Sequence, residues 1–412
     1  MTTLSKQPSF LFAAAPLFLV LFIDSMGLGL IFPILNELLI DPSNHFVAAN
    51  TSTDMRNLLY GGLIGIYMLC WFFGAAFLGD LSDQIGRKKA LMICLIGAFL
   101  SYLLSAFSIP LNSVALLLIA RIVAGITAGS QSIAQAAIID ISSDAHKARN
   151  LGLMLFAISL GFAFGPLIGG LLSDKNLFSS LTFASPFYFA SGISLLNAIL
   201  LQLLFRETFT RTKKIHFKLY HAIEIFISAF THEKVRELSL IFLIMIFGWS
   251  GFFSFISMFL FRLYHFNAMQ TGFYMALLGA GFGIGTGLLV DPLTRRYSLK
   301  SCMIGGSLIT ALCSFLILLK PPVIFIWLYI LPLAASIAIA YSTILTIFSN
   351  QVDARSQGWI MGITGAIMAF AFAINSFLVG VLADFDSRIP LIIAAVGLTL
   401  SAFMMKILFK GK

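Results

Sequence analysis

The chain has 412 residues, of which 59% are apolar and only 10% carry a charge, and its mean hydropathy is +0.98. A soluble domain carries about 25% charged residues, so this composition argues against a soluble enzyme. The 42 Phe residues and the long Leu and Ile runs argue against a disordered chain. The net charge of +9 does not indicate nucleic-acid binding, because the basic residues flank the apolar runs.

Twelve long apolar runs follow one another along the chain. A helix needs about 20 apolar residues to span a bilayer, and the runs are continuous rather than alternating, which indicates helices and not strands. The first run is too long for a signal-peptide core, so we expect it to be retained. The four cysteines fall within the runs and are expected to be small buried side chains. The predicted spans are 11–35, 58–79, 90–109, 113–139, 150–172, 183–205, 237–260, 270–290, 299–319, 322–347, 357–382 and 389–408.

The basic residues between the runs predict an orientation. With the N-terminus inside, 20 of the 26 Lys and Arg residues fall in inner segments and five fall in outer segments, while Arg121 lies within a span. This bias follows the positive-inside rule with both termini cytoplasmic. The sequence therefore predicts a multi-pass protein of an inner or plasma membrane.

The predicted spans divide into two sets of six. The most basic inner segment, 206–236, lies at mid-chain and is partly amphipathic. We interpret it as a cytoplasmic linker that can lie along the membrane surface. It would join an N-terminal six-helix bundle at 1–205 to a C-terminal six-helix bundle at 237–412.

Short sequence echoes relate the two predicted bundles. Gly79 precedes Asp83 and a basic pair, and Gly287 precedes Asp291 and a basic pair at the same spacing, 208 residues later. Two further pairs of segments repeat at offsets of 206 and 210 residues. Such echoes indicate a duplicated unit, and parallel repeats are an architecture of secondary transporters. The sequence therefore predicts an all-α membrane protein built from two pseudo-symmetric six-helix bundles.

Four motifs carry a resemblance to a known family. Gly79–Lys89 resembles the signature loop of the major facilitator superfamily, and Arg121–Gly125 resembles its fourth-helix motif. Gly161–Gly170 resembles the fifth-helix pattern of its antiporters, and Asp24–Leu35 resembles the first helix of the tetracycline/proton antiporters. The resemblance covers the whole chain. It implies the major facilitator fold and membership of the twelve-span drug/proton antiporter branch.

Two charged residues lie deep in predicted spans. Asp24 sits within the first span, where a charge costs about 2.5–3.5 kcal/mol, and Arg121 lies at similar depth in the fourth. An acid in this environment is a candidate for binding and releasing protons, with Arg121 as its electrostatic partner. Because the second half has no charge deep in a span, we place proton coupling in the first half. The alternatives are a neutral Asp24 that serves helix packing and a fixed ion pair.

A charge cluster is predicted at the inner end of the second span. Its glycines permit close helix approach and a tight turn, and its charges fit a conformational latch that forms in one state and breaks in the other. The alternative is a solvated loop that only orients the chain. The predicted latch comprises Gly79, Asp83, Gly86, Arg87 and Lys88, with Asp291 and Arg295 as its weaker counterpart in the second half.

The remaining candidates are uncharged. A small-residue face on the fifth span can pack closely and limit proton leak, or can be ordinary helix packing; it comprises Gly161, Gly165, Pro166, Gly169 and Gly170. Polar and aromatic residues at cavity depth suit a lipophilic or amphiphilic substrate, although each can instead be structural; they are Gln131, Gln135, Trp249, Tyr329, Tyr341 and Asn375.

No metal-binding pair, Walker A segment or nucleophile–base constellation stands out, so we expect no cofactor, no metal and no enzymatic activity. The expected partners are a small-molecule substrate, protons and the lipid bilayer, and we expect a monomer. The first hypothesis is a proton-coupled exporter of a small lipophilic or amphiphilic compound that works by alternating access. The alternatives are a carrier of a siderophore, organic acid or other nutrient, and a non-transporting membrane sensor or channel.

Overall fold

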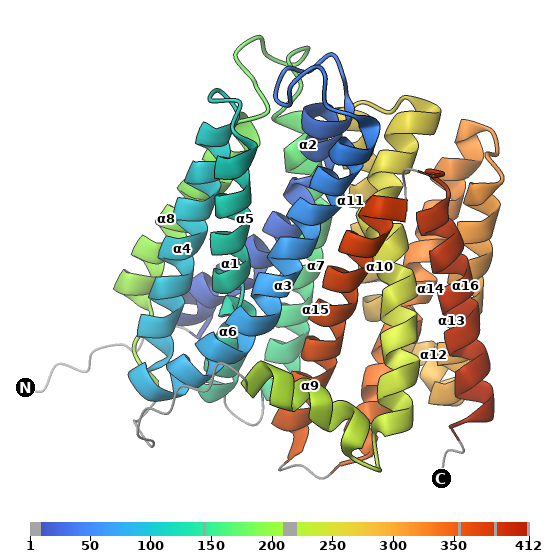
Figure 1. Cartoon of the computed structure of the whole chain (residues 1–412). Coiled ribbons are helices and arrows are strands. Elements are labelled where there is room, and N and C mark those ends of the chain that lie inside the picture. Colours follow the sequence, from blue (N-terminus) through green and yellow to red (C-terminus); the bar gives the residue numbers. More distant parts are fainter. Residues whose placement is uncertain (1–9, 143–145, 209–220, 353–355, 383–384, 410–412) are drawn as a thin grey trace, which may run out of the picture.

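The computed structural model describes residues 10–142, 146–208, 221–352, 356–382 and 385–409. Within these ranges the regular secondary structure is entirely helical. Twelve helices are long and apolar enough to cross a membrane, and they stand side by side as two bundles (Figure 1). The predicted all-α fold with twelve spans is confirmed.

The first six spans form the N-terminal half. Its first span is completed by a short α-helix and a π-helical turn, and its fourth span consists of two helices. The elements are α1 (Phe10–Leu30), α2 (Phe32–Leu35), η1 (Asn36–Ile40), α3 (Thr53–Ile85), α4 (Arg87–Ser108), α5 (Val114–Thr127), α6 (Ser130–Asp140), α7 (Lys147–Leu171) and α8 (Ser185–Leu204).

The last six spans form the C-terminal half, which follows a short connecting helix, α9. Its second span contains a π-helical turn that corresponds to no feature predicted from the sequence. The elements are α9 (His221–Thr231), α10 (Arg236–Tyr264), α11 (Ala268–Ile284), η3 (Gly285–Leu289), α12 (Val290–Arg296), α13 (Leu299–Leu318), α14 (Val323–Asn350), α15 (Gln357–Leu382) and α16 (Ile389–Ile407).

Several helices run beyond the apolar stretches that predict them. Hydropathy predicts 58–79 for the second span, whereas α3 begins after Ser52, whose side chain accepts a hydrogen bond from the Met55 N–H, and ends at Ile85. The fourth span, predicted as one run, is interrupted between α5 and α6. Hydropathy marks the residues that suit lipid, whereas caps and breaks in backbone hydrogen bonding decide where a helix ends.

Glycines bring the two halves together where α7 crosses α11 and where α3 crosses α15. Gly170 on α7 faces Gly272 on α11, and Gly61 on α3 faces Gly380 on α15. A Cβ at any of these positions would meet the backbone of the opposite helix. The absence of side chains therefore permits an approach that larger residues would prevent.

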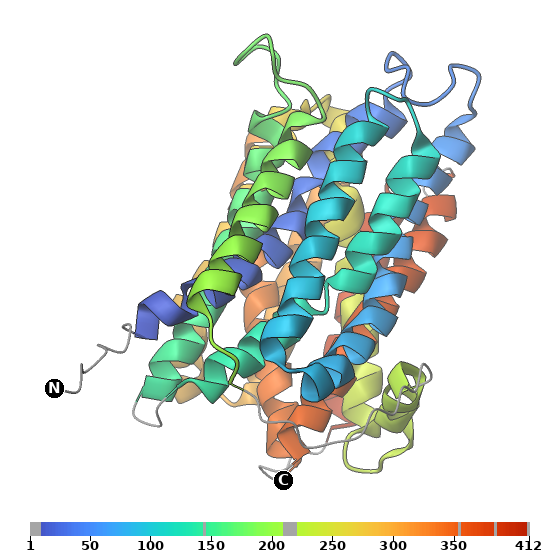
Figure 2. The ribbon, with the colours of Figure 1, turned by 90° about the vertical axis from the view of Figure 1, so that its left-hand side faces the viewer.

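The two ends of the bundle differ. The start of α1, the end of α16 and the helix α9 lie at one end, the termini end, and α2 lies at the opposite, distal end (Figures 1 and 2). Helix α9 falls within the predicted linker and packs against α3 and α15. Its Phe226 ring is 6.1 Å from Phe72 of α3 and 4.4 Å from Phe370 of α15, so α9 packs against both halves.

Candidate functional site

Asp24, on α1, accepts a hydrogen bond from the hydroxyl of Ser130, with 2.5 Å between Oγ and Oδ2. Ser130 is the first residue of α6. The interruption of the fourth span, with Gly129 between α5 and α6, thus places a polar group against the acid of the first span. This contact joins α1 to α6 within the N-terminal half.

Arg121, on α5, is only 5% exposed. Its Nε donates a hydrogen bond to the Leu63 carbonyl of α3 at 3.3 Å, and its guanidinium carbon lies 4.2 Å from the centre of the Tyr67 ring. A guanidinium over an aromatic face gains electrostatic energy from the π-electrons. Arg121 therefore has a backbone carbonyl and an aromatic ring as its partners.

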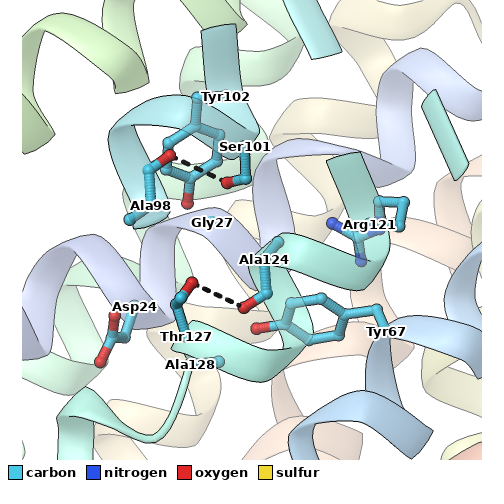
Figure 3. Close-up of a pocket in the computed structure, with 10 residues that line it drawn as sticks. All are labelled: Asp24, Gly27, Tyr67, Ala98, Ser101, Tyr102, Arg121, Ala124, Thr127 and Ala128. Atoms are coloured by element: carbon cyan, nitrogen blue, oxygen red, sulfur yellow. Dashed lines mark hydrogen bonds between the residues drawn. The ribbon is translucent and has the colours of Figure 1, made fainter. Parts of the chain in front are cut away.

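Asp24 and Arg121 line one small pocket between α1, α3, α4 and α5 (Figure 3). They do not form an ion pair in this structure, and Figure 3 shows Tyr67 and Tyr102 on the pocket wall with them. The free volume of the pocket is about 20 Å³, which is space for a water molecule rather than for a drug-sized compound. A space of this size next to Asp24 and Arg121 suits a water molecule.

Three residues of this site are absent from the sequence-based prediction: Ser130, Tyr67 and Tyr102. Tyr102, on α4, fits against α1 because Gly27 lacks a side chain; a Cβ there would collide with the Tyr102 hydroxyl. Both tyrosines lie within predicted spans, as do Tyr329 and Tyr341 of the tenth span, which the sequence does predict as cavity residues. Nothing in the sequence, however, indicates that these two face Asp24.

The predicted latch residues Asp83 and Arg87 lie at the termini end, where α3 passes into α4. The Arg87 guanidinium pairs with Asp83 at 2.7 Å and with Asp140 of α6 at 3.5 Å, and it also contacts the Ser82 hydroxyl. Arg87 thereby ties together three spans of the N-terminal half. Asp83, with 54% of its side chain exposed, remains accessible.

Glu207, which follows α8, is a further member of this cluster that the sequence does not reveal. Its carboxylate accepts hydrogen bonds from the backbone N–H groups of Arg87 and Lys88, at 2.9 and 3.1 Å, and so caps the first turn of α4. Gly86 has a φ of +99°, and a Cβ there would meet the Glu207 carboxylate. The tight turn predicted at this glycine is therefore present.

Two other predicted latch features look different in the structure. A Cβ at Gly79 would meet no atom within 4 Å, so the close helix approach expected there is absent. Asp291 and Arg295 form an ion pair of 2.8 Å within α12, with 70% and 77% of their side chains exposed. The counterpart in the second half is a solvent-facing pair, whereas Arg87 is largely buried.

The small-residue face of α7 is divided between two neighbours. Gly161, Gly165 and Gly169 lie against the backbone of α1, whereas Gly170 lies against α11 of the other half. Pro166 packs against the Gly29 position of α1. The face predicted for the fifth span thus packs against one helix of the N-terminal half, α1, and one helix of the C-terminal half, α11.

The predicted cavity residues do not gather in one place. Asn375 is buried and donates to the Phe247 carbonyl of α10 at 2.7 Å, and Trp249 stacks on Phe252 with ring centres 5.7 Å apart. The Asn375 contact joins α15 to α10, whereas Trp249 and Phe252 lie on the same helix, α10. For these two residues the structure shows contacts with neighbouring helix residues.

Tyr341 belongs to a row of aromatic rings that crosses between the halves. Its ring centre is 6.1 Å from Phe242 on α10 and 6.2 Å from Phe282 on α11, and Phe282 is 6.4 Å from Phe162 on α7. Tyr329 lies near the distal start of α14, with its ring 5.9 Å from Phe325.

Gln131 and Gln135, the last two predicted cavity residues, are half-buried on α6, toward the termini end. No hydrogen bond or ring contact joins any two of the six predicted cavity residues, all of which the structure describes. Their common role as a substrate cavity stays a prediction.

A polar seam joins the halves at the distal end. Asn36 donates to the Ser257 hydroxyl of α10 at 2.6 Å, and Ser257 in turn donates to the Phe32 carbonyl of α2 at 3.0 Å. The Tyr60 hydroxyl donates to the Ser254 carbonyl at 3.0 Å. Each bond connects the N-terminal half to α10.

Charged residues extend this distal seam. Arg262, near the end of α10, donates to the Asn57 side chain at 2.5 Å. The Glu37 carboxylate accepts from the backbone N–H of Ala268, the first residue of α11, at 3.1 Å. We use the name distal seam for these residues together: Phe32, Asn36, Glu37, Asn57, Tyr60, Ser254, Ser257, Arg262 and Ala268.

Two six-span halves that meet at glycine crossings and close at one end, with a half-buried acid between helices, are features of the class of membrane transporters. The family profile of the Major Facilitator Superfamily matches residues 17–374. The class C and class B tetracycline resistance proteins of Escherichia coli are 28% and 26% identical over 358 and 380 residues, and the matches cover 84% and 85% of this chain and 83% and 85% of those proteins. The structure of the human organic anion transporter MFSD10 matches with a TM-score of 0.72 and 21% identity, over 97% of this chain and 100% of that one.

The chain belongs to the Major Facilitator Superfamily. It is a multi-pass membrane transporter, and the proteins that it resembles are carriers rather than enzymes. The resemblance to tetracycline resistance proteins that the motifs indicate is confirmed across most of the chain.

Proposed function

We propose that the protein exports a small lipophilic or amphiphilic compound in exchange for protons. The observation that carries the proposal is Asp24, an acid within a membrane-spanning helix that has a serine hydroxyl as its partner and, among the described residues, no cation within ion-pair distance. A carboxyl group that is not locked in an ion pair is free to exchange a proton, and the adjoining space is large enough for a water molecule that would accept or donate it.

The pair of Asp24 and Arg121 supports a coupling mechanism. In the structure each has its own partner, Ser130 for the acid and the Leu63 carbonyl with the Tyr67 ring for the base. A shift of α1 relative to α5 would bring the two charges together, and an arginine nearby favours the charged carboxylate. The approach and withdrawal of Arg121 would thus bind and release the proton in step with the movement of the halves.

The closure of the bundle at its distal end supports a mechanism of alternating access. The distal seam closes one end of the path between the halves, and each of its bonds involves at least one side chain, so the bonds can break without unfolding a helix. We place the termini end on the cytoplasmic side of an inner or plasma membrane, in keeping with the basic inner segments. The structure then represents a state closed to the outside.

The relatives guide the choice of substrate. Two of them are named as tetracycline resistance proteins, and a structural neighbour is named as an organic anion transporter. Tetracyclines are therefore the first compounds to test, followed by other amphiphilic drugs and by organic anions. The aromatic row through Phe282 and Tyr341 offers flat apolar surfaces that suit such molecules.

The test is substrate flux in inside-out vesicles with an imposed pH gradient. When the lumen is acidic, protons leave it and the wild-type protein should accumulate substrate. We expect Asp24→Asn to lose accumulation while it still exchanges labelled for unlabelled substrate without a gradient. Asp386→Asn, which changes the same type of group in an exposed loop position, is the matched control and should behave like wild type.

The result separates three roles for Asp24. Loss of accumulation with retained exchange assigns it to proton coupling. Loss of both assigns it to folding or substrate binding, and a melting curve of the purified variant distinguishes these. Gradient-driven accumulation by Asp24→Asn at the wild-type rate would falsify the proposal.

A further inference from the structure

An apolar groove runs along the outer face of the C-terminal half, between α13 and α16. Its free volume is about 630 Å³, far larger than the pocket at Asp24. Large apolar side chains with 44% to 60% of their surface exposed line it: Leu308, Leu312, Phe315, Val396, Leu400 and Phe403. Because α13 and α16 are membrane-spanning helices, this groove faces the lipid acyl chains.

A cation stands at the end of the groove that lies toward the termini end. Val396, Leu400, Phe403 and Lys406 follow one another at intervals of three or four residues on α16, so they share one face of the helix. Lys406 is exposed, and its ammonium group forms no hydrogen bond or ion pair with the part of the chain that the structure describes. The same face thus carries an apolar groove and, at its end, a positive charge.

A second lysine lies next to this point. Lys300, in the first turn of α13, donates hydrogen bonds to the carbonyls of Lys406 and Phe409 at 3.1 and 2.6 Å. It fixes the last turn of α16 against the start of α13. An ammonium group has three donors, so Lys300 keeps one for an anion that binds beside Lys406.

Gly305 connects the groove to these lysines. It lies one turn before Leu308 on α13, it is partly exposed, and a Cβ there would meet no atom within 4 Å.

The N-terminal half provides the comparison, since Lys88 at the start of α4 donates to the Gln202 carbonyl near the end of α8 at 2.8 Å. Ile93 follows Lys88 by five residues and has 45% of its surface exposed. In the C-terminal half, Gly305 follows Lys300 by the same five residues.

We propose that the α13–α16 groove is a binding site for an anionic phospholipid. One acyl chain lies in the groove, the glycerol region passes over Gly305, and the phosphate lies between Lys406 and Lys300. Basic pockets between membrane helices near the bilayer surface are suited to anionic headgroups. The site does not depend on the proton-coupling proposal, because its residues lie in the other half of the molecule, on its outer face.

Native mass spectrometry of the detergent-purified full chain tests the site. Phosphatidylglycerol and phosphatidylcholine with identical acyl chains are added at equal concentrations, and the retained lipid is counted. We expect phosphatidylglycerol to be retained preferentially. Lys406→Gln should reduce that preference by roughly fivefold, the effect of one lysine at a membrane surface, while Arg388→Gln at the opposite end of α16 should leave it unchanged.

A second variant tests the groove itself. Gly305→Ile reproduces the residue of the N-terminal half and should lower retention of both lipids, because its side chain obstructs the path between groove and lysines. Equal retention of the two lipids by the wild-type protein would overturn the proposal, since the headgroup would then have no site. Equal losses in Lys406→Gln and Arg388→Gln would also overturn it, because they would show general surface charge rather than a local site.

Discussion

The two halves of the protein share a plan of six spans but not its chemistry. The N-terminal half contains Asp24 and Arg121 within its helices, beside a water-sized polar pocket. In the C-terminal half, α11, α14 and α15 contain no charged residue, and aromatic rings, Ser and Thr hydroxyls and the amide of Asn375 lie in the interior. The difference teaches that two halves with the same number of spans can share close glycine crossings while the charges deep within the spans lie in one half.

The charge clusters at the termini end also differ between the two halves, and again the N-terminal half has more buried charge. The N-terminal half holds Arg87 between Asp83 and Asp140, with Glu207 capping the next helix. At the same end, the C-terminal half has an exposed pair within α12. An exposed pair of this kind contributes little to stability, about 0.3–0.5 kcal/mol. We therefore expect changes in the N-terminal half to have larger consequences throughout.

The largest effect is expected from Arg121→Lys. Lysine keeps the charge but lacks the planar guanidinium that covers the Tyr67 ring and donates to Leu63. A hydrogen bond from a buried charged group contributes about 1.5–3 kcal/mol, so gradient-driven flux should fall at least about tenfold. Arg388→Lys in the C-terminal half is the control. A wild-type flux in Arg121→Lys would show that the side chain only packs.

Helix packing gives the next effect, measured as the melting temperature in detergent. Gly165→Ala should destabilise the protein by about 1–3 kcal/mol, because the new Cβ meets the backbone of α1 at Met26. Gly305→Ala in the C-terminal half meets open space and should leave the melting temperature unchanged. If the two variants melted alike, the close packing of α1 against α7 would not matter to stability.

A smaller shift is expected from the distal seam. Arg262→Gln shortens the side chain that binds Asn57, so the state closed at the distal end should lose population, by a few-fold for one hydrogen bond of about 1 kcal/mol. Distances between spin labels in the distal loops 41–52 and 319–322 measure the change. Unaltered distance distributions would show that this bond does not hold the seam closed.

The smallest effects are expected from substitutions in the two charge clusters at the termini end, around Asp83 and around Asp291. Asp83→Asn removes one partner of the largely buried Arg87 and should shift the balance between the two open states. Asp291→Asn removes an exposed pair and should change flux by less than about twofold. The same spin-label distances, taken together with flux, compare the variants. Equal effects of both substitutions would mean that the clusters are equivalent.

The sequence predicts much of the site because its chemistry is unusual for a membrane span. A charge within an apolar run stands out in any reading of hydropathy, and Asp24 and Arg121 do line one pocket. Their partners do not stand out, because Ser130, Tyr67 and Tyr102 are residue types common in spans. The ion pair that depth alone suggests is absent here, since similar depth leaves the rotation of each helix undefined.

The sequence by itself determined the number of spans, the helical fold class and the presence of two charged residues deep in the first six spans, because hydropathy and charge are properties along a single chain. Only the tertiary structure decided that Asp24 meets Ser130, that Glu207 caps α4, and that the halves close at the distal end. These contacts depend on which face each helix turns to its neighbours and on where a helix breaks. That rotation is set by the packing of all the helices together, as at the glycines of α7.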